Sequence, residues 1–465
     1  MASLAGLLQL QGYRITGSDG AAYPPMSDLL HSLGIPILEP YAEANLDPAP
    51  DLVVIGNALS RGNPEIEYVL DRRIPFTSMA ALLREEFLRG RESLVVAGTH
   101  GKTTTTSMLA WIYQFASNEN PALEPSFLIG GVAENFATSF QLRSTRTFIV
   151  EGDEYDTAFF DKGSKFLHYF PDALILTSVE FDHADIFANL EAVKTAFKRL
   201  VNLIPRRGVI IAYDGNAAVT ECVAHAFCRV ERYGFSDGAD WQIQNLKHES
   251  GLTQWQIWHK GEFWAAIETR LAGEHNALNA TAAAALASTQ GIGKEAIRAA
   301  LASFKSVKRR LEVRAEIGGV TVIEDFAHHP TAIRETLRAL RSVYPQSHLW
   351  AVLEPRSNTL RRKVLQSDLV ASLRLADRVV LAGVYKQQSI PDDERLHPED
   401  VVRALNDLGT EANLYSDGDA IVDAIAPQLA SGDVVAILSN GAFDGIYEKL
   451  PARLKELFQD DGRPI

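Results

Sequence analysis

Cysteine is scarce in this sequence, because the 465 residues include only Cys222 and Cys228. Two cysteines cannot build a disulfide framework, so the sequence predicts a protein of a reducing compartment, the cytoplasm. The stretch that contains them, VTECVAHAFCRV, is typical of a packed helix. His225 lies between the two cysteines, but a zinc site of this spacing would lack a fourth ligand. We therefore favour two small structural cysteines on a helix.

Long hydrophobic runs and blocks of positive charge are also missing. No run approaches the ~18 apolar residues of a membrane span, and no basic segment precedes the first apolar stretch. The formal net charge is −14, without a Lys/Arg-rich block. This balance argues against nucleic acid or an anionic membrane as the main partner, so any phosphate must be bound locally. The sequence does not indicate an oligomeric state.

Length and pattern together predict three α/β domains. A typical domain has about 150 residues, and two charged stretches, REEFLRGRES and KSVKRRLE, divide the chain into three units. We expect an N-terminal domain at residues 1–87, a central domain at 88–305 and a C-terminal domain at 306–465. In each unit short apolar runs alternate with helical segments, which is typical of doubly wound, mostly parallel sheets.

The first domain begins unusually. A predicted helix at residues 2–11 leads into a predicted strand at 13–16, whereas a doubly wound nucleotide-binding domain normally begins with a strand and a Gly-rich turn. We therefore expect a Rossmann-like domain that lacks its first strand, and a true start of the chain upstream. Loss of that strand would leave neighbouring strands unpaired.

The other two domains have clearer patterns. Polar and apolar residues alternate over residues 241–267, which predicts an antiparallel meander at the edge of the central sheet. Helical patterns follow or precede apolar strands throughout. The predicted helices are residues 103–116, 190–203, 276–289 and 294–304 in the central domain and 331–343 in the C-terminal domain.

Residues 95–106 read VVAGTHGKTTTT, an apolar strand followed by a Gly/Thr turn and a helix. Backbone N–H groups of such a turn converge on phosphate oxygens. Lys102 supplies a mobile cation for the β- and γ-phosphates, and the Thr103 hydroxyl can hold Mg²⁺. The usual pattern has a further glycine where Val96 stands, and a Thr-rich helix cap with an incidental lysine is the alternative. The flanking strand and helix favour the phosphate loop, in which we expect Lys102 to be exposed to the ligand.

Two acidic clusters directly follow apolar runs. Because the carboxyl ends of parallel strands meet at the edge that also carries the phosphate loop, both clusters should face the nucleotide. Hard oxygen ligands suit Mg²⁺. A charge run is more often a solvated surface, but a phosphate loop in the same sheet favours the metal interpretation. The first cluster comprises Glu151, Asp153, Glu154 and Asp156, and the second comprises Glu180, Asp182, His183 and Asp185.

Further polar candidates lie in the segment GEHNALNA and at the second domain boundary. His275, Asn276 and Asn279 open a predicted helix, where asparagine can cap the helix or hydrogen-bond a base edge. Capping alone would explain Asn276. Arg309 and Arg310 could reach across a cleft to phosphate, or they could belong to a solvated linker. The sequence does not separate these alternatives.

Two predicted strands of the C-terminal domain end in segments that contain acidic, histidine or arginine residues, EDFAHHP and LEPRSN. A histidine pair before proline could simply pack in a turn, and an arginine after proline could be structural. Both segments lie at the ligand-facing edge of a doubly wound sheet, which favours function. The candidates are Asp325, His328, His329, Glu354, Arg356 and Asn358.

Taken together, these segments resemble the Mur ligase family in their order and domain positions. The matching motifs are GTHGKTTT, EGDEYD, EFDHADIF, GEHNALNA, KRRLE and DFAHHPT. The resemblance covers nearly the whole chain. It implies a Rossmann-like N-terminal domain that binds a UDP-sugar, a central P-loop ATPase domain and a Rossmann-like C-terminal domain that closes over the site. The implied activity is ATP-dependent amide-bond formation between an acid and an amino compound, with ATP and Mg²⁺ as cofactors.

Within the family, the segments DEYDTAFFDKGSKF, EPRSNT and SNGAFDGI are most similar to one group of members. That group joins the murein tripeptide L-alanyl-γ-D-glutamyl-meso-diaminopimelate to UDP-N-acetylmuramate in peptidoglycan (cell wall) recycling. Ala442 and Asp444 depart from the glycines of that pattern. The alternative is the UDP-N-acetylmuramate:L-alanine ligase of peptidoglycan biosynthesis, which shares the phosphate loop and the FAHHP-like segment but typically not EPRSNT.

The resemblance also implies roles for individual residues. Those implied to bind ATP are Gly98, Thr99, His100, Gly101, Lys102, Thr103, Thr104, Asn276, Asn279, Arg310 and Asp325. Those implied to hold Mg²⁺ are Thr103, Glu154 and His183. Those implied to bind the UDP-sugar or the peptide are Ser18, Asp19, Asn63, Glu65, His329, Arg356, Ser357 and Asn358. The implied catalytic residues are Lys102, Glu154, His183 and Arg310.

The implied reaction has two steps. The lactyl carboxylate of UDP-N-acetylmuramate attacks the γ-phosphate to give an acyl phosphate, and the α-amine of the peptide then displaces phosphate. The first step depends on positioning and charge neutralisation, for which Lys102, Arg310 and Mg²⁺ are suited. A base must accept the amine proton, and the sequence does not assign it. Two other classes remain open: a nucleotide-dependent switch that only hydrolyses ATP, and a non-catalytic binding protein without a working sugar site.

Overall fold

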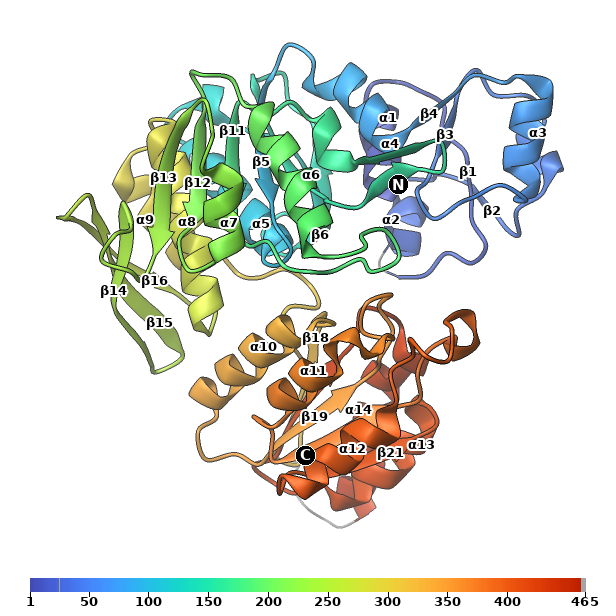
Figure 1. Cartoon of the computed structure of the whole chain (residues 1–465), viewed down its shortest axis with the longest axis vertical. Coiled ribbons are helices and arrows are strands. Elements are labelled where there is room, and N and C mark those ends of the chain that lie inside the picture. The colour runs from blue at the N-terminus through green and yellow to red at the C-terminus, as the bar shows by residue number, and fades with distance from the viewer. Residues whose placement is uncertain (25, 461–465) are drawn as a thin grey trace.

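A single large sheet organises the central domain in the computed structural model, which describes residues 1–24 and 26–460 (Figure 1). Its ten strands have the order β16-β15-β14-β13-β12-β11-β5-β8-β6-β7. The middle strands β5, β8 and β11 are parallel and covered by helices on both faces, which explains their unbroken apolar runs. The strands from β5 to β13 that join this sheet are β5 (Glu92–Ala97), β6 (Ser126–Ala133), β7 (Thr138–Gln141), β8 (Thr147–Gly152), β11 (Ala173–Leu176), β12 (Val209–Tyr213) and β13 (Arg229–Gly234).

The predicted antiparallel meander is confirmed at one edge of this sheet. It consists of β14 (Trp241–Glu249), β15 (Leu252–His259) and β16 (Glu262–Thr269). Its polar and apolar residues alternate because one face packs on helices and the other faces solvent. A separate hairpin of β9 (Asp156–Ala158) and β10 (Asp161–Ser164) was not foreseen.

Helices cover both faces of the central sheet, and their predicted positions are confirmed to within about two residues at each end. One face carries α5 (Lys102–Ala116), α8 (Glu274–Thr289) and α9 (Lys294–Ser303), and the other carries α6 (Leu190–Asn202) and α7 (Ala217–Val223). The prediction of one helix through both cysteines was wrong. Helix α7 ends before Cys228, and the chain then enters β13. The sequence did not indicate this strand, because its buried and exposed residues do not alternate regularly.

The N-terminal domain contains two separate pairs of parallel strands. One pair is β1 (Gly17–Ser18) with β2 (Ile37–Leu38), and the other is β3 (Val53–Ile55) with β4 (Phe76–Ser78). The predicted strand at 13–16 was wrong, because pairing begins only at Gly17. The helices of this domain are α1 (Ala2–Leu10), α2 (Met26–Ser32), α3 (Pro64–Arg72) and α4 (Met79–Leu83).

Helix α1 leaves its own domain and packs on the central one. Leu4 and Leu7 are buried in the same apolar core as Phe140 of β7, and the hydroxyls of Ser3 and Ser139 lie 2.8 Å apart. Only a glycine fits at position 6, since a Cβ there would lie 2.2 Å from the Phe140 ring. The first helix therefore ties the N-terminal domain to the edge of the central sheet.

The C-terminal domain is a second doubly wound unit, as predicted. Its sheet order is β17-β18-β22-β19-β20-β21, parallel except for β17. Helices α10 (Pro330–Val343), α11 (Gln366–Leu373) and α12 (Pro398–Asp407) cover one face, and α13 (Gly418–Ile425) and α14 (Ile446–Asp460) cover the other. The strands are β17 (Glu312–Ile317), β18 (Val320–Asp325), β19 (Leu349–Leu353), β20 (Arg378–Ala382), β21 (Glu411–Tyr415) and β22 (Val434–Leu438).

The predicted boundary at 305/306 falls between α9 and β17, whereas the one at 87/88 falls inside the π-helical turn η2 (Arg84–Leu88). They remain predictions, and residues 25 and 461–465 lie outside the described part of the chain. Among the described helices, none combines the length and apolar character that crossing a bilayer requires.

The docking of α1 generates a stability prediction with an internal control. Leu7 is 0% exposed and Leu10, on the same helix, is 62% exposed. Leu7→Ala should lower the free energy of unfolding by about 2–5 kcal/mol, because it leaves a cavity in the shared core. Leu10→Ala should change it by less than about 0.5 kcal/mol. Urea unfolding followed by circular dichroism measures both, and equal losses would contradict the docked position of α1.

Candidate active site

A cavity of about 1620 Å³ is lined by residues of all three domains. The phosphate loop, both acidic clusters and the start of α8 contribute from the central domain. The linker before β17 and the start of α10 contribute from the C-terminal side. The predicted site residues that line it are Thr99, His100, Gly101, Lys102, Thr103, Thr104, His183, Asn276, Asn279, Arg310, Asp325, His329 and Asn358.

The phosphate loop depends on two glycines. Gly98 has φ 140° and Gly101 has φ 80°, conformations that other residues rarely adopt. A Cβ at Gly98 would lie 2.1 Å from Oγ1 of Thr177, and one at Gly101 would lie 2.6 Å from Oδ1 of Asn279. Val96, which replaces the usual glycine, is buried inside β5, so the tight turn begins only at Gly98.

Lys102 forms a buried ion pair at the base of the cavity. Its Nζ lies 2.8 Å from Oε2 of Glu154 and 2.7 Å from the carbonyl oxygen of Gly98. The two side chains are only 12% and 2% exposed, but Lys102 lines the cavity, and its exposure to a ligand there stays a prediction. Burial alone would lower the pKa of Lys102, but the carboxylates of Glu154 and Asp153 outweigh it and raise that pKa. The lysine is therefore a fixed cation that lines the cavity.

Glu154 also presents an oxygen without a hydrogen-bond donor. Its Oε1 is buried and lies 3.4 Å from Nε2 of His183, close enough for an ion pair but without hydrogen-bond geometry. Burial alone would raise the pKa of Glu154, but Lys102 and His183 outweigh it and hold that pKa low. An ionised, buried oxygen with no donor is a position that a cation can fill. The residues present thus fit a divalent metal.

Thr103 lies on the same side of the cavity. Its hydroxyl donates to Oε1 of Glu151 over 2.8 Å, and Oε2 of Glu151 accepts from the backbone N–H of Gly130 over 2.7 Å. Burial raises the pKa of Glu151. Because the Thr103 proton points to Glu151, the oxygen lone pairs of Thr103 are free to face a metal ion.

The start of α8 settles one alternative for Asn276. The N-cap of this helix is Gly273, and no side chain caps it. The Asn276 side chain instead donates to the carbonyl oxygen of Ala272 over 2.7 Å, and Nδ2 of Asn279 lies 3.5 Å from Oδ1 of Asn276. Capping therefore does not explain Asn276, and both amides line the cavity.

The two adjacent arginines have different positions. The Arg309 guanidinium donates to the carbonyl oxygen of Gly441 over 2.7 Å and pairs with Glu324 inside the C-terminal domain. It is neither a solvated linker residue nor part of the cavity lining. Arg310 lines the cavity, and its guanidinium carbon lies 5.1 Å from the ring centroid of Phe326.

Asp325 fixes the linker beside these arginines. Its Oδ2 accepts from the backbone N–H of Leu311 over 2.8 Å, and its Oδ1 accepts from the N–H of Ala327 over 2.9 Å. Leu311 has φ 49°, so this bond holds an otherwise unfavourable conformation. The carboxylate thus sets where Arg310 enters the cavity.

A second segment of the C-terminal domain closes onto the acidic cluster of the central domain. Nδ2 of Asn358 donates to Asp185 over 2.7 Å, and the Thr359 hydroxyl donates to Asp182. The backbone N–H of Ala184 donates to Oγ1 of Thr359 over 3.2 Å. The structure therefore uses Asn358, predicted to contact the peptide, in a contact between domains.

Arg356 and Ser357 do not line the cavity. The Arg356 guanidinium lies 3.8 Å from the ring centroid of Tyr385 and pairs with Glu354 over 3.1 Å. The Ser357 hydroxyl donates to the carbonyl oxygen of His328 over 3.2 Å. Their predicted role toward the peptide stays a prediction.

The four residues predicted for the UDP-sugar are not brought to the cavity either. Asn63 caps α3 by accepting from the N–H groups of Glu65 and Ile66, and the Glu65 carboxylate accepts from Asn45 over 2.7 Å. Ser18 and Asp19 lie at β1, outside the lining. The N-terminal residues that do line the cavity are Asn57 and Ala58.

Some lining residues escaped the sequence analysis. Asn57 and Ala58 directly follow β3, so the rule that ligands lie beyond strand ends could have identified them. Phe235 follows β13 in the same way, but that strand was not predicted, and its first two residues were included in a predicted helix. Arg334 and Arg338 lie on α10 and also line the cavity; their charge on one helix face gave no distinct signal.

His329 caps α10 at the cavity wall. Its Nδ1 accepts from the backbone N–H of Thr331 over 3.3 Å, and its Nε2 lies 3.3 Å from the carbonyl oxygen of Phe181. Because a carbonyl only accepts and an N–H only donates, Nε2 carries the proton and Nδ1 the lone pair. Burial, with the neighbouring charge of His100, lowers the pKa of His329 to about 4.

Three family models match the chain in order. They are the Mur ligase family catalytic domain at residues 1–90, the Mur ligase middle domain at 96–287 and the Mur ligase glutamate ligase domain at 309–441. The UDP-N-acetylmuramate–L-alanyl-γ-D-glutamyl-meso-2,6-diaminoheptandioate ligase of Escherichia coli K12 is 41% identical over 452 residues. That alignment covers 97% of this chain and 95% of the relative.

Two further comparisons bear on the alternatives. The UDP-N-acetylmuramate–L-alanine ligase of Lachnoclostridium phytofermentans is 31% identical, over 97% of this chain and 95% of the relative. The crystal structure of a murein peptide ligase from Psychrobacter arcticus 273-4 is 36% identical, with a TM-score of 0.74, and covers 98% of this chain and 96% of that one.

The position of His329 generates a pH prediction. Its pKa is lowered from 6.5 to about 4 in the folded protein, so the unfolded chain binds the proton first. The folded protein keeps His329 neutral, and its unfolding free energy is unaffected by this group above pH 6.5. As the pH falls from 6.5 toward 4, the unfolding free energy decreases by on the order of 3 kcal/mol, because the unfolded chain binds the proton more tightly. His329→Asn keeps a capping side chain and should flatten the decline of unfolding free energy between pH 7 and 4. Urea titrations at several pH values measure it, with exposed His225→Asn as control; an unchanged slope in His329→Asn would refute the assignment.

Proposed function

We propose that this chain, which belongs to the Mur ligase family, joins L-alanyl-γ-D-glutamyl-meso-diaminopimelate to UDP-N-acetylmuramate in peptidoglycan recycling. It is an ATP-dependent ligase that forms an amide bond. The observation that supports these substrates is the match, over nearly the whole of both chains, to the Escherichia coli ligase that is named for them. A cytoplasmic location is part of the proposal, in keeping with the two unpaired cysteines.

ATP lies with its phosphates at the loop of residues 98–104. Backbone N–H groups at the start of α5 face the phosphate oxygens, because Gly101 turns the chain into the helix there. Lys102 supplies a cation already held in place by the Gly98 carbonyl group. Asn276 and Asn279 contact the base from the start of α8, and Asp325 lies near the ribose.

Mg²⁺ is held by Glu154, Thr103 and His183. The donor-free oxygen of Glu154 and the lone pairs of Thr103 support this assignment. When bound, the ion neutralises phosphate charge during phosphoryl transfer.

Charge balance explains the first chemical step. The lactyl carboxylate and the γ-phosphate repel each other, and cations must offset that repulsion as the acyl phosphate forms. Lys102 enters from the central domain and Arg310 from the C-terminal side of the same cavity. Asn57 and Ala58 of the N-terminal domain line the same cavity, which supports binding of the nucleotide sugar there. The amine of the peptide then displaces phosphate.

The L-alanine ligase activity is the weaker candidate. The corresponding relative is 31% identical, against 41% for the tripeptide ligase, over equal coverage of this chain. The segment EPRSNT also favours the tripeptide.

The two arginines provide a matched test of the cavity assignment. Arg310→Ala should lower kcat by about 10²–10³, because it removes a cation from the developing phosphate charge, with little change in stability. Arg309→Ala should instead destabilise the fold by up to about 3–5 kcal/mol, because it leaves the Glu324 carboxylate, 4% exposed, with only the longer ion pair to Arg314 at 3.6 Å. Steady-state kinetics and urea unfolding of both variants separate the effects. A folded Arg310→Ala enzyme with unchanged kcat would contradict the role.

The substrate is tested by mass spectrometry of products. The protein is mixed with ATP, Mg²⁺, UDP-N-acetylmuramate and either the tripeptide or L-alanine. We expect a tripeptide adduct with an equal amount of ADP, and a loss of at least about 10²-fold in Lys102→Ala, whose folding is checked by circular dichroism. An L-alanine adduct alone would favour the synthetic ligase. ATP hydrolysis without an adduct would favour a nucleotide switch, and neither reaction would favour a binding protein.

A further inference from the structure

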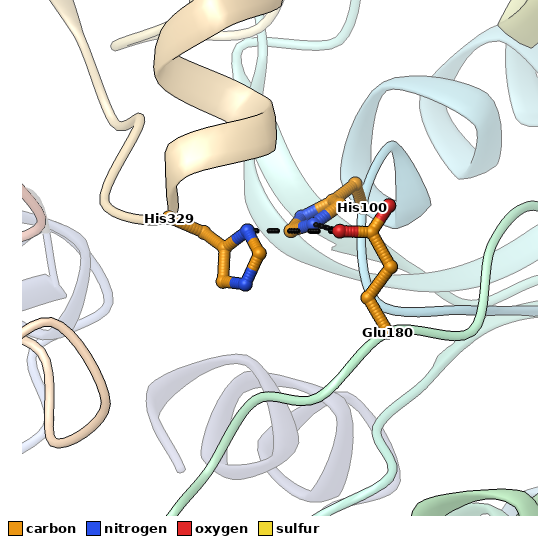
Figure 2. Close-up of side chains that lie close together, drawn as sticks. All are labelled: His100, Glu180 and His329. Atoms are coloured by element: carbon orange, nitrogen blue, oxygen red, sulfur yellow. Dashed lines mark hydrogen bonds and ion pairs between the residues drawn. The ribbon is translucent and has the colours of Figure 1, made fainter. Parts of the chain in front are cut away.

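Three side chains from two domains converge beside the phosphate loop (Figure 2). His100 comes from the loop itself, Glu180 from the segment after β11, and His329 from the start of α10. Nε2 of His100 lies 3.4 Å from Oε2 of Glu180, and Nδ1 of His329 lies 3.8 Å from the same oxygen. One possible ligand atom from each residue lies within 4.8 Å of the others.

The hydrogen bonds of this cluster identify the ring nitrogen of His329 that can bind a metal. Nε2 donates to the carbonyl oxygen of Phe181, so Nδ1 carries the lone pair. That lone pair accepts the N-cap bond of α10 from the Thr331 N–H over 3.3 Å, and Nδ1 lies 3.8 Å from Oε2 of Glu180. A metal ion at Nδ1 would replace this one long hydrogen bond.

The outer partners of these side chains match those of metal ligands. A metal-binding histidine usually donates its second ring N–H to a carbonyl or carboxylate, which fixes the tautomer and the ring. His329 already has that arrangement through Phe181. The Thr331 hydroxyl likewise holds Oε2 of Glu180 over 2.6 Å, as an outer partner of a ligating carboxylate does.

We propose that His100, Glu180 and His329 form a binding site for a transition-metal ion such as Zn²⁺, which links the central and C-terminal domains. Two imidazoles and one carboxylate with open positions suit Zn²⁺, whereas Mg²⁺ prefers sites in which most ligands are oxygens. The site shares no residue with the magnesium residues Thr103, Glu154 and His183. It goes beyond the ligase activity and does not depend on it.

The consequence is control of domain closure. The ion receives His100 and Glu180 from one domain and His329 from the other, so it binds only when the domains are together. A ligand that binds one state alone shifts the population toward that state. Bound metal therefore holds the closed arrangement and slows the reopening that each catalytic cycle requires.

The test is Zn²⁺ binding by the full chain after dialysis against a chelator, measured by isothermal titration calorimetry without nucleotide. We expect one ion per chain, and a loss of affinity of about 100-fold or more in Glu180→Gln and in His100→Gln, since even outer-partner changes cost 10–100-fold. The matched control is His168→Ala. His168 faces Asp161 over 2.8 Å in a similar histidine–carboxylate pair, which has no third ligand among the residues that the structure describes. Its loss should not change binding.

A second readout separates this site from others. Zn²⁺ should raise the melting temperature and lower the radius of gyration in X-ray scattering for the natural protein, but not for Glu180→Gln. Circular dichroism establishes whether each variant is folded. If His100→Gln does not fold, Glu180→Gln still provides the test, because it keeps the shape of the side chain. Zn²⁺ binding that survives both variants, or that is lost in His183→Ala instead, would overturn the proposal.

Discussion

The contact between residues 180–185 and the C-terminal domain is the constraint on which the site depends. Thr331 bonds Glu180, Thr359 bonds Asp182 and Asn358 bonds Asp185, so three side chains of one acidic cluster are partnered across the domain boundary. A doubly wound sheet gathers its polar groups at the carboxyl edge, so each domain alone carries half of a site. This contact brings the two edges together, and residues of both domains line the cavity.

Charge explains why that cavity needs cations. Glu151 and Glu154 are buried within an acidic chain of net charge −14, and Lys102 is the cation that their carboxylates act on. ATP would add further negative charge at the same place. A lysine already paired with Glu154 cannot offset all of it, so additional positive charge is required. Arg310 supplies positive charge from the C-terminal side of the cavity. A metal ion bound at the donor-free oxygen of Glu154 would supply further positive charge from the central domain.

The sequence predicted the larger architecture because long periodic segments carry strong signals. Helices α5 and α6 and the buried strands were identified almost to their ends, whereas β13, β17 and β21 were missed because their burial patterns are mixed. Individual site residues were harder to assign. Arg309 and Arg310 are neighbours with identical chemistry, yet Arg309 bonds inside the C-terminal domain and Arg310 lines the cavity, which their sequence could not distinguish. Likewise, His100, Glu180 and His329 were recognised in three separate motifs, but no spacing indicated that they meet.

The closed arrangement is held by polar contacts, and this has a consequence for motion. A hydrogen bond contributes about 0.5–1.5 kcal/mol net, or somewhat more when one partner is charged. The bonds of Thr331, Asn358 and Thr359 therefore stabilise closure by only a few kcal/mol. Apolar contact plays a smaller part, because the two faces of each sheet pack within their own domain. An equilibrium of that size can be moved by any ligand that touches both sides. Domain closure is thus weak enough to be reversible, and Asn358, which is predicted to contact the peptide, is among the residues that hold it.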